Sequence, residues 1–272
     1  MSRHRPPKPQ REPRPSPRQE RSRRAPDAAA PGSRGAHLVY GFHAVRAALE
    51  ARRRPFLALH ATEAAAERLA DVIAAVRLRP HLVTGEDLSR RLGAQAVHQG
   101  VLLEAGPMPT LDLSEIESRS GLVLVLDQIT DPHNVGAILR TAAAFAVDAL
   151  VTTTRHAPEM SGILAKAASG AADLVPIVEV VNLARALEEL AELGYWRVGL
   201  DSEGPTPFEA APVSRPLALV LGAEDKGLRR LTRERCDALA RLDMPGAIKS
   251  LNVSNACAVA LTLARQRLAA AG

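Results

Sequence analysis

The sequence has few residues of the types that define several common protein classes. It contains two cysteines among 272 residues, Cys236 and Cys257. Two thiols cannot supply the four ligands of an ordinary structural zinc site and do not suggest a disulfide scaffold, so we expect no metal and a reducing compartment. One Trp, two Tyr and four Phe leave little aromatic surface for binding single strands by base stacking.

Long apolar segments are also missing. No run approaches the roughly 20 residues that span a bilayer, and the charged N-terminus is not followed by the apolar segment of a secretory signal. Six prolines among residues 6–17 exclude the amphipathic helix of an organellar transit peptide. We predict a cytoplasmic protein that is not bound to a membrane.

The positive charge is concentrated at the N-terminus. Residues 1–34 hold ten of the 35 Lys and Arg residues and three of the 30 acidic ones, which leaves 25 bases and 27 acids for the rest of the chain. The same segment has eight of the 20 prolines and no Val, Ile, Leu, Phe, Tyr or Trp, so it cannot bury enough apolar surface to offset the entropy of folding. We predict a disordered basic tail over 1–35, which either binds a polyanion such as RNA or serves only solubility.

A small α/β domain is predicted over residues 36–106, where short apolar segments alternate with helical patterns. The ordered sequence begins near residue 37; the predicted strands are 56–60, 81–83 and 100–104, and the predicted helices are 42–52, 62–78 and 85–93. Thr62 is a candidate N-cap for the second of these helices. Gly106, Pro107 and Pro109 then indicate a linker over 107–118.

A larger α/β domain is predicted over 119–272. Residues 122–126 form a continuous apolar run, as expected of a strand buried on both faces. Further predicted strands are 148–153, 174–178, 196–200, 217–221 and 239–242, and the predicted helices are 135–146, 158–169, 182–193 and 252–268. This alternation predicts a parallel or mostly parallel sheet with helices on both faces, in which ligands bind beyond the carboxyl ends of the strands.

Three of these strand ends carry unusual residues, and the first is the segment 127–136, which runs into a helix containing Arg140. Six residues, close to two helical turns, separate Asn134 from Arg140, so we expect both to reach one cleft. The alternative is structural: Asp131 caps the helix, Pro132 is its first residue, and Arg140 is a solvated charge.

The second segment, 221–228, has two glycines five residues apart after a strand. It is not a triphosphate-binding loop, because Leu228 and Arg229 stand where that motif needs Lys and Ser or Thr. Gly222 would permit a ligand to approach the backbone, with Glu224 beside it. A plain turn is the alternative.

The third segment, 242–255, contains a glycine loop and then several Ser and Asn residues at the start of a long apolar helix. One Ser or Asn is expected as an N-cap, but a cap explains only one of them. The surplus of polar residues indicates a binding or catalytic site.

Together the three segments resemble the signature motifs of the SpoU-type branch of the SPOUT RNA 2′-O-methyltransferases. The matching sequences are DPHNVGAILR at 131–140, LGAEDKGL at 221–228 and MPGAIKSLNVS at 244–254. Residues 40–45 and 98–101 also look like the substrate-binding domain of members that methylate a guanosine ribose in 23S ribosomal RNA. The resemblance covers about residues 38–270.

The resemblance implies a substrate-binding domain followed by a trefoil-knotted α/β domain that binds S-adenosylmethionine, in a homodimer acting on RNA. The residues that it implies for cofactor binding are Gly222, Leu242, Met244 and Leu251. Those that it implies for the catalytic cleft are Asn134, Arg140, Glu224, Ser250 and Asn252.

The implied reaction, transfer of a methyl group to a ribose 2′-hydroxyl, needs a poor nucleophile to be aligned and its developing charge stabilised. A guanidinium hardly ever loses its proton, so we assign Arg140 to stabilising the alkoxide and placing the neighbouring phosphate. Glu224 is expected to orient Arg140 or a water. Two other functions remain open: ribose methylation of transfer RNA, and binding of RNA or the ribosome without catalysis.

Overall fold

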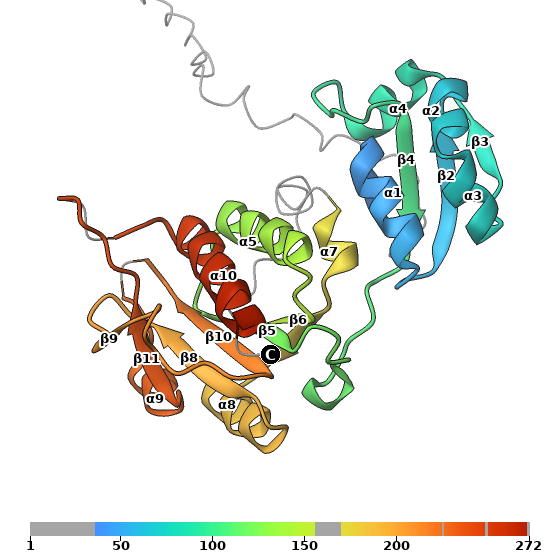
Figure 1. Ribbon diagram of the computed structural model, residues 1–272. Coiled ribbons are helices and arrows are strands. Elements are labelled where there is room, and N and C mark those ends of the chain that lie inside the picture. The colour runs from blue at the N-terminus through green and yellow to red at the C-terminus, as the bar shows by residue number, and fades with distance from the viewer. Residues whose placement is uncertain (1–35, 156–169, 225, 248–249, 271–272) are drawn as a thin grey trace, which may run out of the picture. The chain divides into compact units, whose positions relative to one another are not determined.

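The computed structural model describes residues 36–155, 170–224, 226–247 and 250–270, which contain two β-sheets (Figure 1). The predicted disordered tail over 1–35 and the predicted helix over 158–169 lie outside the described residues. No described helix has both the length and the apolar character that crossing a membrane would need.

The N-terminal domain is built on a four-stranded sheet in the order β1-β4-β2-β3. Strands β1 and β2 run antiparallel to β4, and β3 runs parallel to β2. Its elements are β1 (His37–Tyr40), α1 (Phe42–Ala51), β2 (Phe56–Ala61), α2 (Glu63–Arg68), α3 (Ala70–Val76), β3 (Pro80–Leu82), α4 (Gly85–Leu92) and β4 (Val101–Ala105). Leu49 of α1, Leu59 of β2 and Leu103 of β4 are fully buried in one apolar cluster.

The helix expected over 62–78 is two shorter helices. Thr62 is the N-cap, as predicted, and its hydroxyl accepts a hydrogen bond from the Ala65 N–H at 3.4 Å. The helical dihedral angles are interrupted at Leu69, where φ is −106° and ψ is 8°. Leu69 is fully buried, so the apolar pattern continues across the break. The break therefore cannot be predicted from the sequence pattern.

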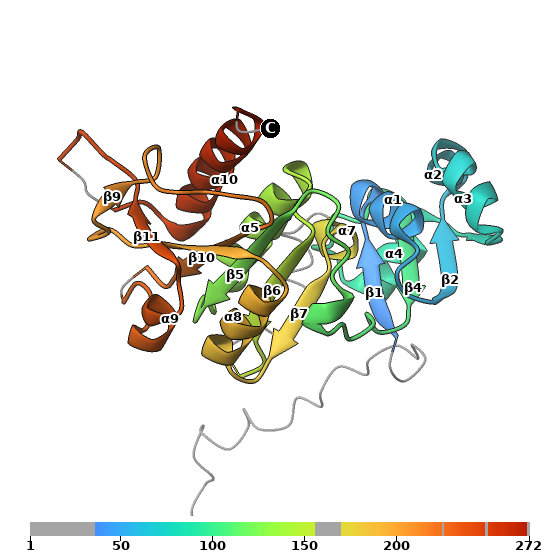
Figure 2. The ribbon, with the colours of Figure 1, turned by 60° about the horizontal axis from the view of Figure 1, so that its bottom comes forward.

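The C-terminal domain is built on a seven-stranded sheet in the order β7-β6-β5-β10-β8-β11-β9. Every pairing in this sheet is parallel, which confirms the predicted type of sheet. Its strands are β5 (Leu122–Asp127), β6 (Ala149–Thr153), β7 (Ile177–Val180), β8 (Trp196–Leu200), β9 (Thr206–Pro207), β10 (Leu217–Gly222) and β11 (Ala238–Arg241). Figure 2 shows the central strands side by side.

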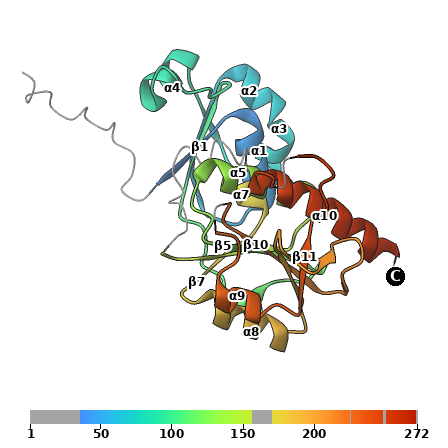
Figure 3. The ribbon, with the colours of Figure 1, turned by 90° about the vertical axis from the view of Figure 1, so that its left-hand side faces the viewer.

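Helices cover both faces of this sheet. Figure 3 shows α5 and α10 on one face and α8 and α9 on the other. The helices are η1 (Leu113–Glu115, a 3-10 turn), α5 (Pro132–Ala144), α7 (Ala171–Leu174), α8 (Leu183–Glu192), α9 (Arg230–Glu234) and α10 (Val253–Ala270).

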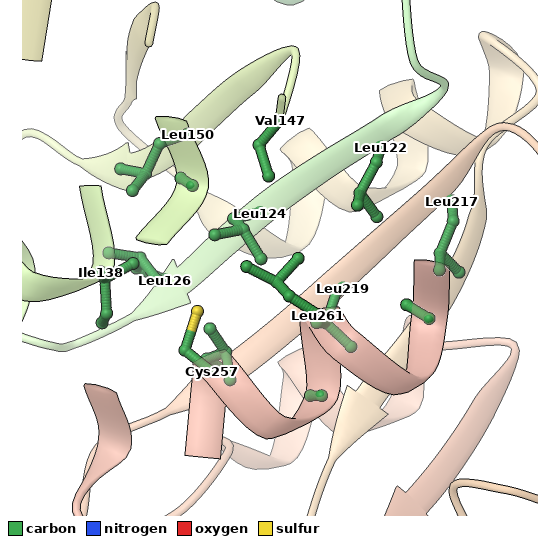
Figure 4. Packing of buried hydrophobic residues seen from close by; sticks show 14 of the residues in the cluster. Leu122, Leu124, Leu126, Ile138, Val147, Leu150, Leu217, Leu219, Cys257 and Leu261 are labelled. Carbon is green, nitrogen blue, oxygen red and sulfur yellow. The ribbon is translucent and has the colours of Figure 1, made fainter. Parts of the chain in front are cut away.

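The core of this domain is divided by strand β5, whose six residues are all buried. Leu122, Leu124 and Leu126 belong to the cluster on the side of α5 and α10, whereas Val123 and Val125 belong to the cluster on the side of α8. Figure 4 shows the first cluster, with Ile138 of α5 and Cys257 and Leu261 of α10 packed near the leucines. The continuous apolar run therefore marks a strand buried on both faces, as expected.

The two cysteines are free thiols. Burial raises the pKa of Cys257 to about 12, and burial is also the largest cause that raises the pKa of Cys236 to about 12. Both thiols therefore stay protonated and unreactive near neutral pH.

Three elements differ from the sequence prediction. The strand expected over 174–178 begins only at Ile177, after Pro176, and the preceding residues form α7. Strand β9 has two residues and helix α9 has five, and both are too short to give a periodic pattern.

Candidate active site

A pocket lies at the carboxyl ends of strands β8 and β10, beside the chain that follows β11 and the start of α10. This is where a parallel sheet is expected to bind its ligand. All four residues predicted to bind a cofactor line the pocket: Gly222, Leu242, Met244 and Leu251. Two of the predicted catalytic residues, Glu224 and Ser250, line it as well.

The turn after β10 forms one wall of this pocket. The Gly227 N–H donates to the Ala223 carbonyl at 2.8 Å, and Gly227 has a φ of +60°, a conformation that favours glycine. A Cβ atom on Gly222 would lie 2.2 Å from the carbonyl carbon of Gly227. Gly222 is thus required by the closure of the turn itself, rather than only by close approach of a ligand.

One residue from each of the three motifs meets at the rim of this pocket. The Asn134 side-chain amide donates to Glu224 Oε1 at 3.1 Å. The Asn252 amide donates to the same Glu224 oxygen at 2.6 Å and to Asn134 Oδ1 at 2.9 Å. We call these three side chains the amide–carboxylate cluster.

The cluster is joined to the N-terminus of α10. Glu224 Oε1 also accepts the Val253 backbone N–H at 3.0 Å, and Asn252 Oδ1 accepts the backbone N–H and the hydroxyl of Ser254 at 3.0 and 2.5 Å. These bonds satisfy N–H groups that the first turn of a helix leaves free, and the helix dipole favours a carboxylate there. Asn252 is therefore the N-cap of α10, where the sequence predicted that one Ser or Asn would cap the helix, and it bridges two other motifs as well.

The three side chains of the cluster differ in how many donors and acceptors remain free to bind another molecule. Asn252 uses both amide hydrogens and its carbonyl oxygen, so it has no donor left for a substrate. Asn134 keeps one amide hydrogen, and Glu224 Oε2 accepts nothing from the described residues. The groups of the cluster that can still bind another molecule are therefore on Asn134 and Glu224.

Arg140 does not join the cluster. It is exposed on α5, and it makes no hydrogen bond or ion pair with the residues that the structure describes. Arg140 lies six positions after Asn134, which corresponds to about 1.7 turns, so the two side chains leave the helix in different directions. The structural features considered for this helix are present: Asp131 accepts the His133 N–H at 3.0 Å, and Pro132 is the first helical residue.

Sequence reasoning did not single out three other residues at these strand ends. Asp201 and Ser202 follow β8 and line the pocket, and Asp127 ends β5 with no exposed surface. All three follow or end a predicted strand, so the rule that places ligands at carboxyl ends could have found them. Within the described ranges, no group of three or more metal-ligating side chains is present.

Comparison with known proteins shows that a chain with this fold and site is an RNA 2′-O-ribose methyltransferase. The chain belongs to the SpoU rRNA methylase family, which it matches over residues 121–262. Residues 38–110 match a second family, described as RNA 2′-O ribose methyltransferase substrate binding. The resemblance inferred from the motifs is thereby confirmed.

Proteins similar to this chain include two curated relatives, each named 23S rRNA (guanosine-2′-O-)-methyltransferase RlmB. The one from Pseudomonas aeruginosa is 41% identical and the one from Pseudomonas putida 39% identical; in both, the match covers 84% of this chain and 96% of the relative. The crystal structure of the SpoU methyltransferase AviRb from Streptomyces viridochromogenes with AdoMet has a TM-score of 0.70 and 26% identity, and covers 86% of this chain and 91% of its own.

The cofactor of this family is S-adenosylmethionine, and the pocket has the chemistry to hold it. Leu200, Leu242 and Leu251 offer apolar walls for a purine, whereas Asp201 and Glu224 offer carboxylates for hydroxyl groups and for a positive charge. The residues present therefore fit the cofactor. When bound, it supplies the methyl group.

Proposed function

We propose that this protein methylates the 2′-hydroxyl of a guanosine in 23S ribosomal RNA with S-adenosylmethionine. The observation that carries the proposal is the match to relatives named for that reaction, which extends through both domains. The joining of Asn134, Glu224 and Asn252 in one cluster supports an intact site.

Arg140 acts on the RNA in this proposal. Its exposed guanidinium, which has no partner among the described residues, is available for a ribose oxygen and the adjacent phosphate. Because a guanidinium keeps its proton near neutral pH, it stabilises the developing alkoxide instead of removing the proton.

The amide–carboxylate cluster positions the hydroxyl. Asn134 has one amide hydrogen to donate, and Glu224 Oε2 can accept a hydrogen bond from the hydroxyl or from a water next to it. Ser250 lines the pocket, is exposed and makes no hydrogen bond with the described residues, so its hydroxyl is free to bind RNA or cofactor. Asn252 holds the other two residues in place.

The remaining parts of the proposal concern organisation. We expect a basic tail at 1–35, a substrate-binding domain at 36–106, a linker at 107–118 and a methyltransferase domain at 119–272 that contains the trefoil knot. The family resemblance supports a homodimer acting in the cytoplasm. Light scattering of the purified protein tests the homodimer, because a monomeric mass would contradict it.

Two other functions remain as alternatives. Methylation of transfer RNA uses the same chemistry, but residues 38–110 match a substrate-binding family and the relatives that share both domains are named for 23S rRNA. A protein that binds RNA without catalysis would not need the cluster of three motifs that is present here.

One experiment separates the three functions. The protein is incubated with methyl-labelled S-adenosylmethionine and, in parallel, with unmodified 23S rRNA, 16S rRNA and transfer RNA. We expect label only in 23S rRNA, on a guanosine ribose after nuclease digestion. Label in transfer RNA alone would support the second function, and RNA binding with no label in any sample would support the third.

A further inference from the structure

Helix α9 follows the turn that carries Gly222 and Glu224, and two arginines four residues apart connect it to the sheet. Arg229 is the residue before the helix, and Arg233 lies in its last turn. Arg229 has an extended backbone, with φ −63° and ψ 152°, so it is not part of the helical turn that carries Arg233. The two side chains bind carboxylates at different strand ends.

Arg229 binds the carboxylate at the end of β5. Its Nε donates to Asp127 Oδ1 at 2.6 Å, and its backbone N–H donates to Asp127 Oδ2 at 2.9 Å. The Asp127 side chain has no exposed surface, whereas 43% of the Arg229 side chain is exposed. A buried carboxylate needs such donors, so this contact is specific and not a chance pairing on the surface.

Arg233 binds the carboxylate that follows β8. Its Nη1 lies 3.0 Å from Asp201 Oδ2, and Asp201 Oδ1 accepts the Glu203 N–H at 2.9 Å. The Asp201 side chain is 7% exposed. Asp201 also lines the cofactor pocket, so this ion pair lies at the edge of the candidate active site.

The two carboxylates lie on opposite sides of the turn. Strand β10 lies between β5 and β8 in the sheet, and it pairs with both, with Gly222 opposite Asp127 and Leu221 opposite Leu200. The turn after β10 is therefore fixed to the end of the strand on each side by Arg229 and Arg233. The exposed ion pair between Arg230 and Glu234, at 2.6 Å, lies within α9 and does not connect the turn to a strand.

We propose that Arg229 and Arg233 are positioning residues that hold the β10–α9 turn in the conformation that binds the cofactor and presents Glu224. The turn places Gly222, Glu224 and Gly227 in the wall of the pocket. Leu228 anchors its end in the core, and the two ion pairs tie it to the strand ends on either side. The inference rests on the proposed function only where it concerns the positioning of the RNA hydroxyl by Glu224. Binding of the cofactor by this turn does not depend on which RNA is methylated.

The test compares Arg229→Ala and Arg233→Ala with Arg230→Ala, which removes an exposed arginine from the same helix. We expect the first two to weaken binding of S-adenosylhomocysteine about tenfold by calorimetry, since small misplacements of site residues have large effects. Arg233→Lys, which keeps a cation near Asp201, is expected to regain most of the affinity. Arg230→Ala is expected to bind like the unaltered protein.

Hydrogen exchange distinguishes positioning from a general loss of stability. In Arg229→Ala and Arg233→Ala, peptides covering 222–229 are expected to exchange faster while those covering β5 exchange as before. If an alanine variant does not fold, the corresponding glutamine variant, Arg229→Gln or Arg233→Gln, which keeps much of the side chain but removes its charge, is measured with the same two methods. Affinity and exchange equal to those of Arg230→Ala would overturn the proposal. Neither method uses RNA, so failure of the proposed function would not affect the result.

Discussion

The two halves of the candidate active site differ in how strongly the fold holds their side chains. Asn134, Glu224 and Asn252 bind one another and the first turn of α10 through hydrogen bonds of 2.6 to 3.1 Å. Arg140 and Ser250 are exposed and have no hydrogen-bonding partner in the described part of the chain. The first group therefore contributes to the fold, and we propose that the second group is kept free for a ligand.

The comparison predicts different costs of substitution. Removing a side chain that the fold already uses should reduce both stability and activity. Removing a side chain that the fold does not use should reduce activity alone. The five predictions below begin with the largest expected effect, and those for Arg140, Ser250 and Asn252 test this difference directly.

Gly222→Val should abolish binding of S-adenosylhomocysteine. The new Cβ would lie 2.2 to 2.5 Å from the backbone of Gly227 and Leu228, so the turn cannot close. Calorimetry measures the loss. Gly246→Ala is the control, because a Cβ at Gly246 meets none of the described residues within 4 Å. Equal affinities of the two variants would remove the turn from the site.

Arg140→Ala should lower turnover by about 10²- to 10³-fold, as expected for loss of a group that stabilises charge in the transition state. Cofactor affinity and unfolding temperature should stay unchanged, because the fold does not use this side chain. Arg185→Ala, which removes an exposed arginine from α8, is the control. Near-normal turnover of Arg140→Ala would refute the role assigned to this residue.

Ser250→Ala should reduce turnover by about tenfold through loss of one hydrogen bond to the bound molecules. The free energy of unfolding, measured in urea, should not change. A marked loss of stability would show that Ser250 belongs with the bonded cluster.

Asn252→Ala should reduce the free energy of unfolding by about 1 kcal/mol, because the helix loses its N-cap. Turnover should fall as well, since Asn134 and Glu224 lose the amide that bridges them. Asn255→Ala, at an exposed position of the same helix, provides the control. An unchanged free energy of unfolding in Asn252→Ala would show that this side chain does not stabilise the fold, and would contradict its placement in the first group.

Deleting residues 2–34 should have the smallest effect on catalysis. The segment has ten cations, and the slope of log affinity against log salt should flatten by about 0.7 to 0.9 for each phosphate that the truncated protein no longer neutralises. RNA affinity is measured across a salt series for the full chain and the truncated one. Identical slopes would indicate a tail that serves only solubility.

The sequence predicted correctly those parts of the fold where a residue pattern is compatible with a single type of secondary structure. The apolar run at 122–126 is strand β5, extended by Asp127. The same reasoning gave a strand from residue 174, yet Leu174 ends α7 and is 47% exposed. Val175 and then Pro176 follow, and the proline has no backbone N–H to donate to a neighbouring strand, so the strand starts after it.

The candidate site was predicted as a set of residues but not as an arrangement. The motifs gave Asn134, Glu224 and Asn252, which do meet. Nothing in the sequence shows that Asn252 uses all its hydrogen bonds for the fold, because that depends on contacts across 28 and 118 residues of chain. The position of Asp201 after a predicted strand could have been used, but its ion pair with Arg233 could not be predicted, because Arg233 lies on a helix too short to be recognised from its pattern.

The all-parallel order of the large sheet has a consequence for folding kinetics. Parallel neighbours cannot be joined by a hairpin, and β10 pairs with β5, which lies about 95 residues earlier in the chain. Contacts so distant in sequence form slowly, because a long loop must close before they contribute. The hydrogen bond between Asn134 and Glu224 spans 90 residues, so it can form only once β5 and β10 are paired. Methyl transfer, for which the proposed function needs this cluster, should therefore be regained only after β5 and β10 have paired during refolding.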